Sequence, residues 1–306
     1  MYADIICEGG GVKGIALVGS INCLENYGYE FKKMAGTSAG AIIASLLAVG
    51  YSGEELKNIV FNLNYSKLIF NTKLDKFLSN LKGSMNIFIK KGFYSSKNIE
   101  NYLNSLFVAK GKTKFKDISI NNESPLKIIA SDITNKKLLI LPDDLNSYGI
   151  DPMEFEISKA VIMSISIPFY FTPYILKANN EKFFIVDGGL LSNFPIWLFD
   201  TKEMPLWPTF GLRLKEDDLF HLKKRYHLFS YISDIIQTAF SHNENIYLEN
   251  KDSIRTIDLP TLNIKSTDFN LNNSEILTLY KSGYKTTENF INSWCFEDYI
   301  SRYRKI

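Results

Sequence analysis

Residues 31–50 read FKKMAGTSAGAIIASLLAVG. We expect a strand at about Phe31–Ala35, a tight turn around Ser38, and then a helix rich in small residues. Serine is a poor nucleophile at neutral pH, so a catalytic serine has to be exposed on a tight turn beside a base. Strand, turn and helix are the context that G-x-S-x-G requires, and Gly36 and Gly40 keep side-chain bulk away from the serine. The segment predicts a nucleophile at Ser38, with an inert serine in a tight turn as the alternative.

A glycine-rich loop precedes this segment. Residues 9–14 read Gly-Gly-Gly-Val-Lys-Gly and follow the apolar run Ile5-Ile6-Cys7. The loop offers consecutive backbone N–H groups at the positive end of the following helix, with no Cβ in the way. It therefore suits a developing oxyanion. Lys13 is expected to hold the loop by hydrogen bonds or to be solvated at its edge.

The same loop also fits a nucleotide-binding pattern. It matches G-x-G-x-x-G, and Glu30 stands near the position of a ribose-binding acid. This dinucleotide interpretation leaves Ser38 and Asp187 without a role. A Walker A loop is excluded, because Ile15 and Ala16 stand where that motif needs lysine and Ser/Thr.

A third motif, Asp187-Gly188-Gly189, ends the apolar segment Phe183–Val186. The two glycines leave room for close approach to the carboxylate. An aspartate with a pKa of about 3.9 is a weak base, so partial burial has to raise its pKa before it can take a serine proton. A plain Asp-Gly-Gly turn is the alternative, and the presence of the other two motifs argues against it.

Composition and charge narrow the function classes. The chain has 306 residues, of which 45% are hydrophobic and 22% charged, and this predicts a single large domain. A net charge of +2 gives no electrostatic footprint for nucleic acid. Cys7, Cys23 and Cys295 lack metal-ligand spacing, and no signal peptide or membrane span is evident, so we expect a cytoplasmic protein. The aromatic content of 14% predicts an aromatic core, part of which could line an acyl-chain pocket.

The order of expected elements predicts an α/β fold with a mostly parallel sheet flanked by helices. Ser52 and Glu55 form a capping-box pattern that opens a helix. We expect further helices at about 13–26 and 151–166, before Pro168 and Pro173 interrupt the second of these. Strands are expected at about 4–8, 126–131, 138–141, 182–186 and 209–214.

Two regions lie outside this core of residues 4–214. Residues 61–116 are expected to form a mostly helical insertion, with loops around Gly83, Gly92 and Gly111. Residues 215–306 are expected to form a helical extension, with helices at 229–249 and 275–294 and a strand at 253–259. In the insertion, apolar residues surround two lysines, which fits either a packed core segment or a transient membrane contact: Ile87, Phe88, Ile89, Lys90, Lys91, Phe93 and Tyr94.

The three motifs together resemble the patatin-like phospholipases, whose pattern is G-G-G-x-[KR]-G, then G-x-S-x-G, then D-G-[GA]. Ser164–Pro173 is similar to the proline-bearing segment between the serine and aspartate motifs of that family, and Leu190–Pro195 continues it. Asp268–Leu271 and Leu279–Tyr284 are similar to the tail of bacterial members. The resemblance covers nearly the whole chain, most specifically residues 4–50 and 160–214.

The resemblance implies a three-layer α/β sandwich and a lipid acyl hydrolase of the phospholipase A or lysophospholipase type. Ser38 would attack the ester of a lipid or phospholipid, and Asp187 would be its only side-chain base, with no metal or organic cofactor. The backbone N–H groups of Gly9, Gly10 and Gly11 would form the oxyanion hole. The resemblance assigns supporting roles to Val12, Lys13, Gly14, Gly36, Gly40, Gly188 and Gly189.

Two other functions stay open. Histidine is the usual proton carrier of serine hydrolases, and His221, His227 and His242 follow Ser38 and Asp187 in the order of an α/β hydrolase triad. None of the three has a distinctive context, so we expect them to be solvent-exposed or structural. The other possibility is a module that binds lipid or nucleotide without catalysis. Oligomeric state, head group and acyl length are not evident from the sequence.

Overall fold

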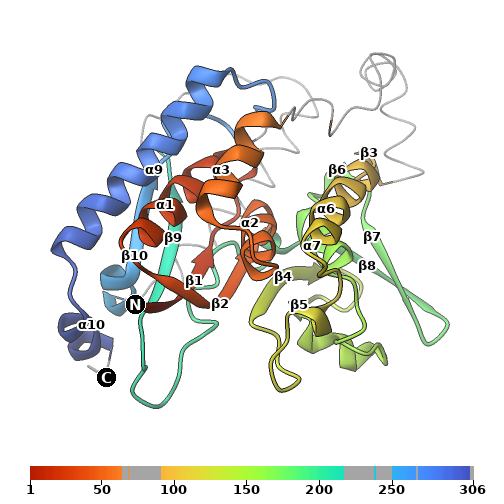
Figure 1. Ribbon diagram of the computed structural model, residues 1–306. Helices are drawn as coiled ribbons and strands as arrows, with labels where there is room; N and C mark the ends of the chain where they lie inside the picture. Colours follow the sequence, from red (N-terminus) through yellow and green to blue (C-terminus); the bar gives the residue numbers. More distant parts are fainter. Residues whose placement is uncertain (64–67, 69–90, 217–237, 239–249, 267, 304–306) are drawn as a thin grey trace.

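The computed structural model describes the chain except residues 64–67, 69–90, 217–237, 239–249, 267 and 304–306 (Figure 1). Its main sheet contains eight of the described strands in the order β10-β9-β1-β2-β4-β8-β7, with β5 also paired to β4. A separate pair joins β3 to β6. The strands are β1 (Tyr2–Cys7), β2 (Glu30–Thr37), β3 (Gly92–Tyr94), β4 (Leu126–Asp132), β5 (Lys137–Leu141), β6 (Phe169–Phe171), β7 (Tyr174–Ala178), β8 (Glu181–Asp187), β9 (Thr209–Lys215) and β10 (Thr256–Pro260).

Helices flank this sheet (Figure 1). The α-helices of the described residues are α1 (Ile15–Asn26), α2 (Ala39–Ala48), α3 (Gly53–Asn62), α6 (Lys97–Ala109), α7 (Ile157–Ile165), α9 (Asn273–Ser293) and α10 (Phe296–Tyr303). Short 3-10 helices are η1 (Gly11–Gly14), η2 (Phe115–Asp117), η3 (Asp143–Tyr148), η4 (Gly188–Leu190) and η5 (Asn250–Arg255). The predicted α/β class is confirmed.

The sheet is mixed but mostly parallel. Strands β10, β9, β1, β2 and β4 run parallel to one another, whereas β5 and β8 are antiparallel to β4 and β7 is antiparallel to β8. The glycine loop follows β1, and Ser38 follows β2. Because carboxyl ends of parallel strands meet at one edge, both segments lie at the same edge of the sheet.

Two local predictions are confirmed by the helices. Ile15, Val18, Ile21 and Leu24 of α1 are buried. Ser52 and Glu55 form the predicted capping box at the start of α3, with the Glu55 amide donating to Ser52 Oγ at 3.2 Å and the Ser52 amide donating to Glu55 Oε2 at 2.9 Å.

The C-terminal segment belongs to the same packed core. Strand β10 extends the sheet beside β9, and α9 lies along α1 (Figure 1). The two helix backbones approach so closely that a Cβ on Gly19 would lie 2.0 Å from the Tyr280 carbonyl oxygen, and one on Gly283 would lie 1.9 Å from that of Ala16. Glycine is therefore required on both helices.

Several predicted bounds were wrong. Residues 151–156 are not helical, because the carbonyls of Met153 and Phe155 accept hydrogen bonds from the amides of Lys116 and Phe115. Helix α7 begins only at Ile157. The sequence analysis also missed β6 and β7, expected a loop where Gly92 begins β3, and began the strand of β10 three residues early, where η5 lies.

Other predictions lie outside the described residues. These are the loop at Gly83, the helix at 229–249 apart from the single residue Thr238, and the apolar residues Ile87, Phe88 and Ile89 with Lys90. Of the residues around them, Lys91 is exposed, whereas Phe93 and Tyr94 are half-buried. Among the helices that the structure describes, none is both long and apolar enough to cross a bilayer.

Candidate active site

Ser38 lies on a strained turn between β2 and α2. Its φ is 52°, in the left-handed region that is unfavourable for a residue with a Cβ. The flanking glycines are required by close packing: a Cβ on Gly36 would lie 2.3 Å from the carbonyl carbon of Gly40, and one on Gly40 would lie 2.1 Å from the Cys7 carbonyl oxygen. The strain at Ser38 is thus held in place by helix α2, which packs directly on β1 and β2.

The hydroxyl of Ser38 donates a hydrogen bond to Asp187. Ser38 Oγ lies 2.6 Å from Asp187 Oδ2. Asp187 ends β8 and is fully buried, and Ser38 is only 6% exposed. The other carboxylate oxygen, Oδ1, accepts the amide hydrogen of Gly189 at 2.8 Å. The structure brings together the predicted serine and aspartate from positions 149 residues apart, in direct contact.

Burial changes the basicity of this carboxylate. Burial raises the pKa of Asp187 to about 7, although the hydrogen bonds from Ser38 and the Gly189 amide lower it in part. A base with a pKa near the working pH is the most effective general base. Such a rise is needed if Asp187 is to take a proton from serine.

The amides of the glycine loop are not equivalent. The Gly9 amide donates to the Asn193 carbonyl oxygen at 3.2 Å, so it is unavailable to a substrate in this structure. The Val12 amide donates to the Ser266 carbonyl at 3.1 Å, and the Lys13 amide donates to the Gly10 carbonyl at 3.2 Å. Within the described part of the chain, the amides of Gly10 and Gly11 have no acceptor. Of the three predicted donors, Gly10 and Gly11 are therefore the two whose amides have no acceptor among the described residues.

A further amide lies beside the serine. Ala39 is the first residue of α2, so its N–H has no acceptor within the helix. Among the described residues it has no other acceptor. In hydrolases with a G-x-S-x-G turn, the amide after the nucleophile contributes to the oxyanion hole. The sequence analysis did not name Ala39, although its position directly after Ser38 could have identified it.

The C-terminal end of α7 contacts both members of the pair. Ser164 Oγ accepts the Ser38 amide hydrogen at 2.8 Å and donates to the Ile129 carbonyl at 2.6 Å. The Ser166 carbonyl accepts the amide hydrogen of Asp187 at 2.9 Å. Residues 164–166 therefore hold the backbones of Ser38 and Asp187 next to each other. Sequence reasoning noted this segment but assigned it no role.

Side chains also support the glycine loop. Lys13 is 3% exposed and forms an ion pair with Glu216, so it is buried rather than solvated at the loop edge. Glu8 is also buried, and it accepts hydrogen bonds from the Leu214 amide and from Asn193 Nδ2. These contacts join the loop to β9 and to the segment after Asp187.

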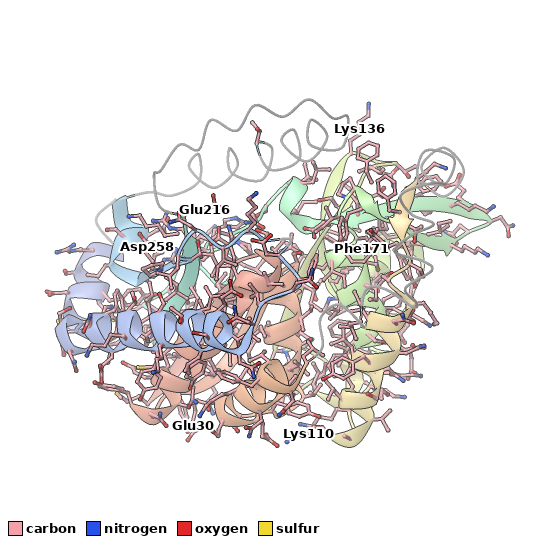
Figure 2. All side chains as sticks on the ribbon, turned by 90° about the horizontal axis from the view of Figure 1, so that it is seen from above. Glu30, Lys110, Lys136, Phe171, Glu216 and Asp258 are labelled. Atoms are coloured by element: carbon pink, nitrogen blue, oxygen red, sulfur yellow. The ribbon has the colours of Figure 1, made fainter. Side chains whose placement is uncertain are left out.

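The dinucleotide interpretation does not fit the structure. Glu30 pairs with Tyr2 at the amino ends of β1 and β2, the edge opposite the glycine loop. Figure 2 shows Glu30 on the opposite side of the molecule from Glu216, the partner of Lys13. A Cβ on Gly11 would lie 2.0 Å from the Ser266 carbonyl oxygen, so the protein itself fills the space next to this glycine.

The described residues give little support for a metal site or for a reactive cysteine. They contain no group of three or more His, Cys, Asp and Glu side chains that could hold a metal ion. Burial raises the pKa of the Cys7 thiol to about 12 and that of Cys23 to about 11, which keeps both thiols protonated. His221, His227 and His242 lie outside the described residues.

The fold and the site define an α/β protein with a serine–aspartate pair at the carboxyl edge of its sheet. Residues 5–200 match the family model described as patatin-like phospholipase, and the chain belongs to this family. It is 38% identical to an uncharacterized protein of Bacillus subtilis, YqhO, over 97% of this chain and 100% of that protein. It is 27% identical to a "Probable lipid hydrolase" of Invertebrate iridescent virus 6, over 92% of this chain and 86% of the viral protein.

Solved structures show the same fold. VipD from Legionella pneumophila superposes with a TM-score of 0.56 at 16% identity, over 95% of this chain and 67% of VipD. The type III effector ExoU superposes with a TM-score of 0.52 at 15% identity, over 99% of this chain and 54% of ExoU. At this level of identity the likeness concerns the fold alone.

Proposed function

We propose that the protein hydrolyses carboxylic esters of lipids through a dyad of Ser38 and Asp187. The hydrogen bond of 2.6 Å from Ser38 Oγ to Asp187 Oδ2 carries the proposal. Family membership and the viral relative described as a lipid hydrolase support it.

The mechanism follows from the contacts at the site. Ser38 Oγ attacks the acyl carbonyl carbon while its proton moves to Asp187 Oδ2, which is partly ionised at neutral pH because its pKa is about 7. The amides of Gly10, Gly11 and Ala39 stabilise the oxyanion. Protonated Asp187 then gives its proton to the leaving alcohol, and an acyl-enzyme remains on Ser38. The ionised carboxylate next activates water, which releases the fatty acid.

A histidine triad is the weaker alternative. In a triad the histidine stands between nucleophile and acid and hydrogen-bonds to both. Here the carboxylate contacts the serine hydroxyl directly, so no ring lies between them. We therefore propose that His221, His227 and His242 have no part in proton transfer. Replacing each with alanine, one at a time, and measuring esterase activity tests this proposal.

Two measurements test the function itself. A fluorophosphonate probe should label the wild type and leave Ser38→Ala unlabelled, whereas a module that only binds lipid would remain unlabelled in both forms. Comparing the products released from a phospholipid mixture by wild type and Ser38→Ala identifies the head group and the ester position. Absence of any product difference would contradict the proposal.

We also propose that the whole chain forms one domain in the cytoplasm and makes a transient contact with a membrane surface. Lys91, which is exposed, and the neighbouring half-buried Phe93 are the described residues on which this proposed contact rests. Liposome flotation tests the contact. Unchanged binding after replacing both Lys91 and Phe93 with alanine would contradict it.

A further inference from the structure

A surface groove lies at the amino edge of the sheet, between the end of α1, the start of β2 and the end of α2. Its volume is about 350 Å³, which exceeds the roughly 150 Å³ of a cavity that holds benzene and falls within the size range of small-molecule sites. Its lining includes two carboxylates, Glu25 and Glu30, and the other lining side chains are aromatic or apolar. Figure 2 shows Glu30 on the opposite side of the molecule from Glu216, which pairs with Lys13 of the glycine loop. The groove is therefore remote from the candidate active site.

Glu25 is a half-buried carboxylate with no cation paired to it. Its Oε2 accepts the amide hydrogen of Gly53 at 2.7 Å, and within the described part of the chain it forms no other hydrogen bond and no ion pair. Burial raises the pKa of Glu25 and the nearby charge of Glu55 adds to the rise, although the hydrogen bond from Gly53 opposes it. Glu55, by contrast, pairs with Lys110 at 2.8 Å. A cation in the groove would therefore favour the ionised form of Glu25.

Tyr29 presents a hydroxyl group in the same groove. The side chain is only 6% exposed, and its ring packs edge-to-face on the buried Phe210, with 5.3 Å between the ring centres. The hydroxyl forms no hydrogen bond to any described residue, and its oxygen is not fully enclosed. The small exposed part of Tyr29 thus includes this oxygen, on the side that lines the groove. A nearly buried hydroxyl gains a missing partner when a ligand donates to it.

The walls of the groove favour an organic cation over a metal ion. The Tyr51 ring already contacts an ammonium group, because Lys110 Nζ lies 4.4 Å from the ring centre. Phe31 provides a further ring, and Met34 and Leu47 provide apolar surface for an alkyl group. The part of the chain that the structure describes has no group of three acidic, histidine or cysteine side chains of the kind that holds a metal ion.

We propose that this groove binds a small primary ammonium compound with an apolar tail. The ammonium group has a positive charge and three N–H donors, of which one would bind Glu25 Oε1 and another the Tyr29 hydroxyl oxygen. The tail would lie against Leu47. Glu30 adds negative charge at the rim, where Lys32 lies 3.8 Å from it and is itself exposed. Because the groove is remote from Ser38, the inference does not depend on the proposed hydrolase activity.

The first test is isothermal titration calorimetry of the wild-type chain with n-butylammonium chloride at constant ionic strength. We expect saturable binding at one site. Tetramethylammonium has no N–H donor and 1-butanol has no charge, so each should bind at least about tenfold more weakly. Ser38→Ala should bind n-butylammonium as tightly as wild type. Absence of saturable binding, equal binding of tetramethylammonium, or loss of binding in Ser38→Ala would overturn the proposal.

Two conservative variants test the residues. Glu25→Gln keeps an acceptor for the Gly53 amide but removes the charge, and should weaken n-butylammonium binding at least about tenfold. Tyr29→Phe keeps the ring against Phe210 but removes the hydroxyl, and should weaken binding about threefold to tenfold. Glu123→Gln is the matched control, because Glu123 is exposed and does not line the groove, so its affinity should equal that of wild type. Wild-type affinity in both Glu25→Gln and Tyr29→Phe would overturn the proposal. Thermal melts verify that the variants fold.

Discussion

Ser164 and Ser38 are joined by a buried hydrogen bond of 2.8 Å from the Ser38 amide to Ser164 Oγ, although they are 126 residues apart in the chain. Ser164 Oγ in turn donates to the Ile129 carbonyl. Ser164 thus links the turn that carries Ser38 to strand β4, which pairs with the strand that carries Asp187. We infer that Ser164 positions Ser38 and does not itself react.

Replacing Ser164 tests this link. Ser164→Ala should lower kcat about 10- to 100-fold with little change in KM, because the turn loses its anchor while the substrate-binding surface is retained. The buried Ser38 amide and Ile129 carbonyl would each lose a partner, at a cost of about 1–3 kcal/mol in the free energy of unfolding. Ser164→Thr keeps the hydroxyl and should recover most of kcat. An equally large loss of kcat in the threonine variant would contradict a role through the hydroxyl.

The rate should depend on pH through Asp187. Its ionised form is the base, and its pKa is about 7, so kcat/KM should rise with pH through about 7 and then level off. The measurement is a pH profile with an uncharged ester. A midpoint near pH 4 would show that Asp187 titrates as an ordinary exposed carboxylate.

Asp187→Asn should separate activity from stability. The change should lower kcat about 10² to 10⁴-fold, because the amide cannot accept the serine proton. In the wild type, the folded state retains a proton on Asp187 between the unfolded pKa near 3.8 and the folded pKa near 7, so the free energy of unfolding falls as pH rises across this window. Asparagine cannot ionise, so the free energy of unfolding of the variant should rise relative to that of wild type between pH 5 and pH 8. Chemical denaturation of both proteins at the two pH values measures this difference. A constant difference between the two proteins would contradict a raised pKa.

The backbone strain at Ser38 gives another stability prediction. Its φ of 52° is unfavourable for residues with a Cβ and favourable for glycine. Ser38→Gly should therefore unfold at higher denaturant concentration than Ser38→Ala, by about 1 kcal/mol in the free energy of unfolding. Both variants lack the nucleophile, so the comparison isolates the backbone. Equal stability would show that the turn relaxes when the hydroxyl is lost.

Two glycines of the motifs should differ in tolerance. Gly40→Ala would place a Cβ 2.1 Å from the Cys7 carbonyl oxygen and should cost at least about 3 kcal/mol in the free energy of unfolding. Gly14→Ala is the matched control, because the nearest atom to a Cβ on Gly14 would be the Ala39 Cβ, at 3.4 Å. Its thermal midpoint should stay near that of wild type. A loss in Gly40→Ala as small as that in Gly14→Ala would mean that helix α2 can shift away from β1.

The sequence predicted the parts of the site that depend on local geometry. Strand, glycine turn and helix around Ser38 form a short continuous unit, so residue spacing alone specifies them. The Asp187 motif was found in the same way, from an apolar strand followed by glycines. The extent of the helix before Pro168 was predicted less well, because the carbonyls of Met153 and Phe155 bond to residues distant in the sequence.

Other features depended on which groups fold against each other. The sequence presents Gly9, Gly10 and Gly11 as equal donors, but only the fold directs the Asn193 carbonyl to Gly9 and leaves the other two amides open to a substrate. The sequence by itself predicted the candidate nucleophile, its turn and the identity of the candidate base. The tertiary structure decided that Ser38 and Asp187 are in contact, that burial raises the pKa of Asp187 to about 7, and that Ser164 anchors the turn. These properties arise from desolvation and from hydrogen bonds between distant segments, which residue spacing does not encode.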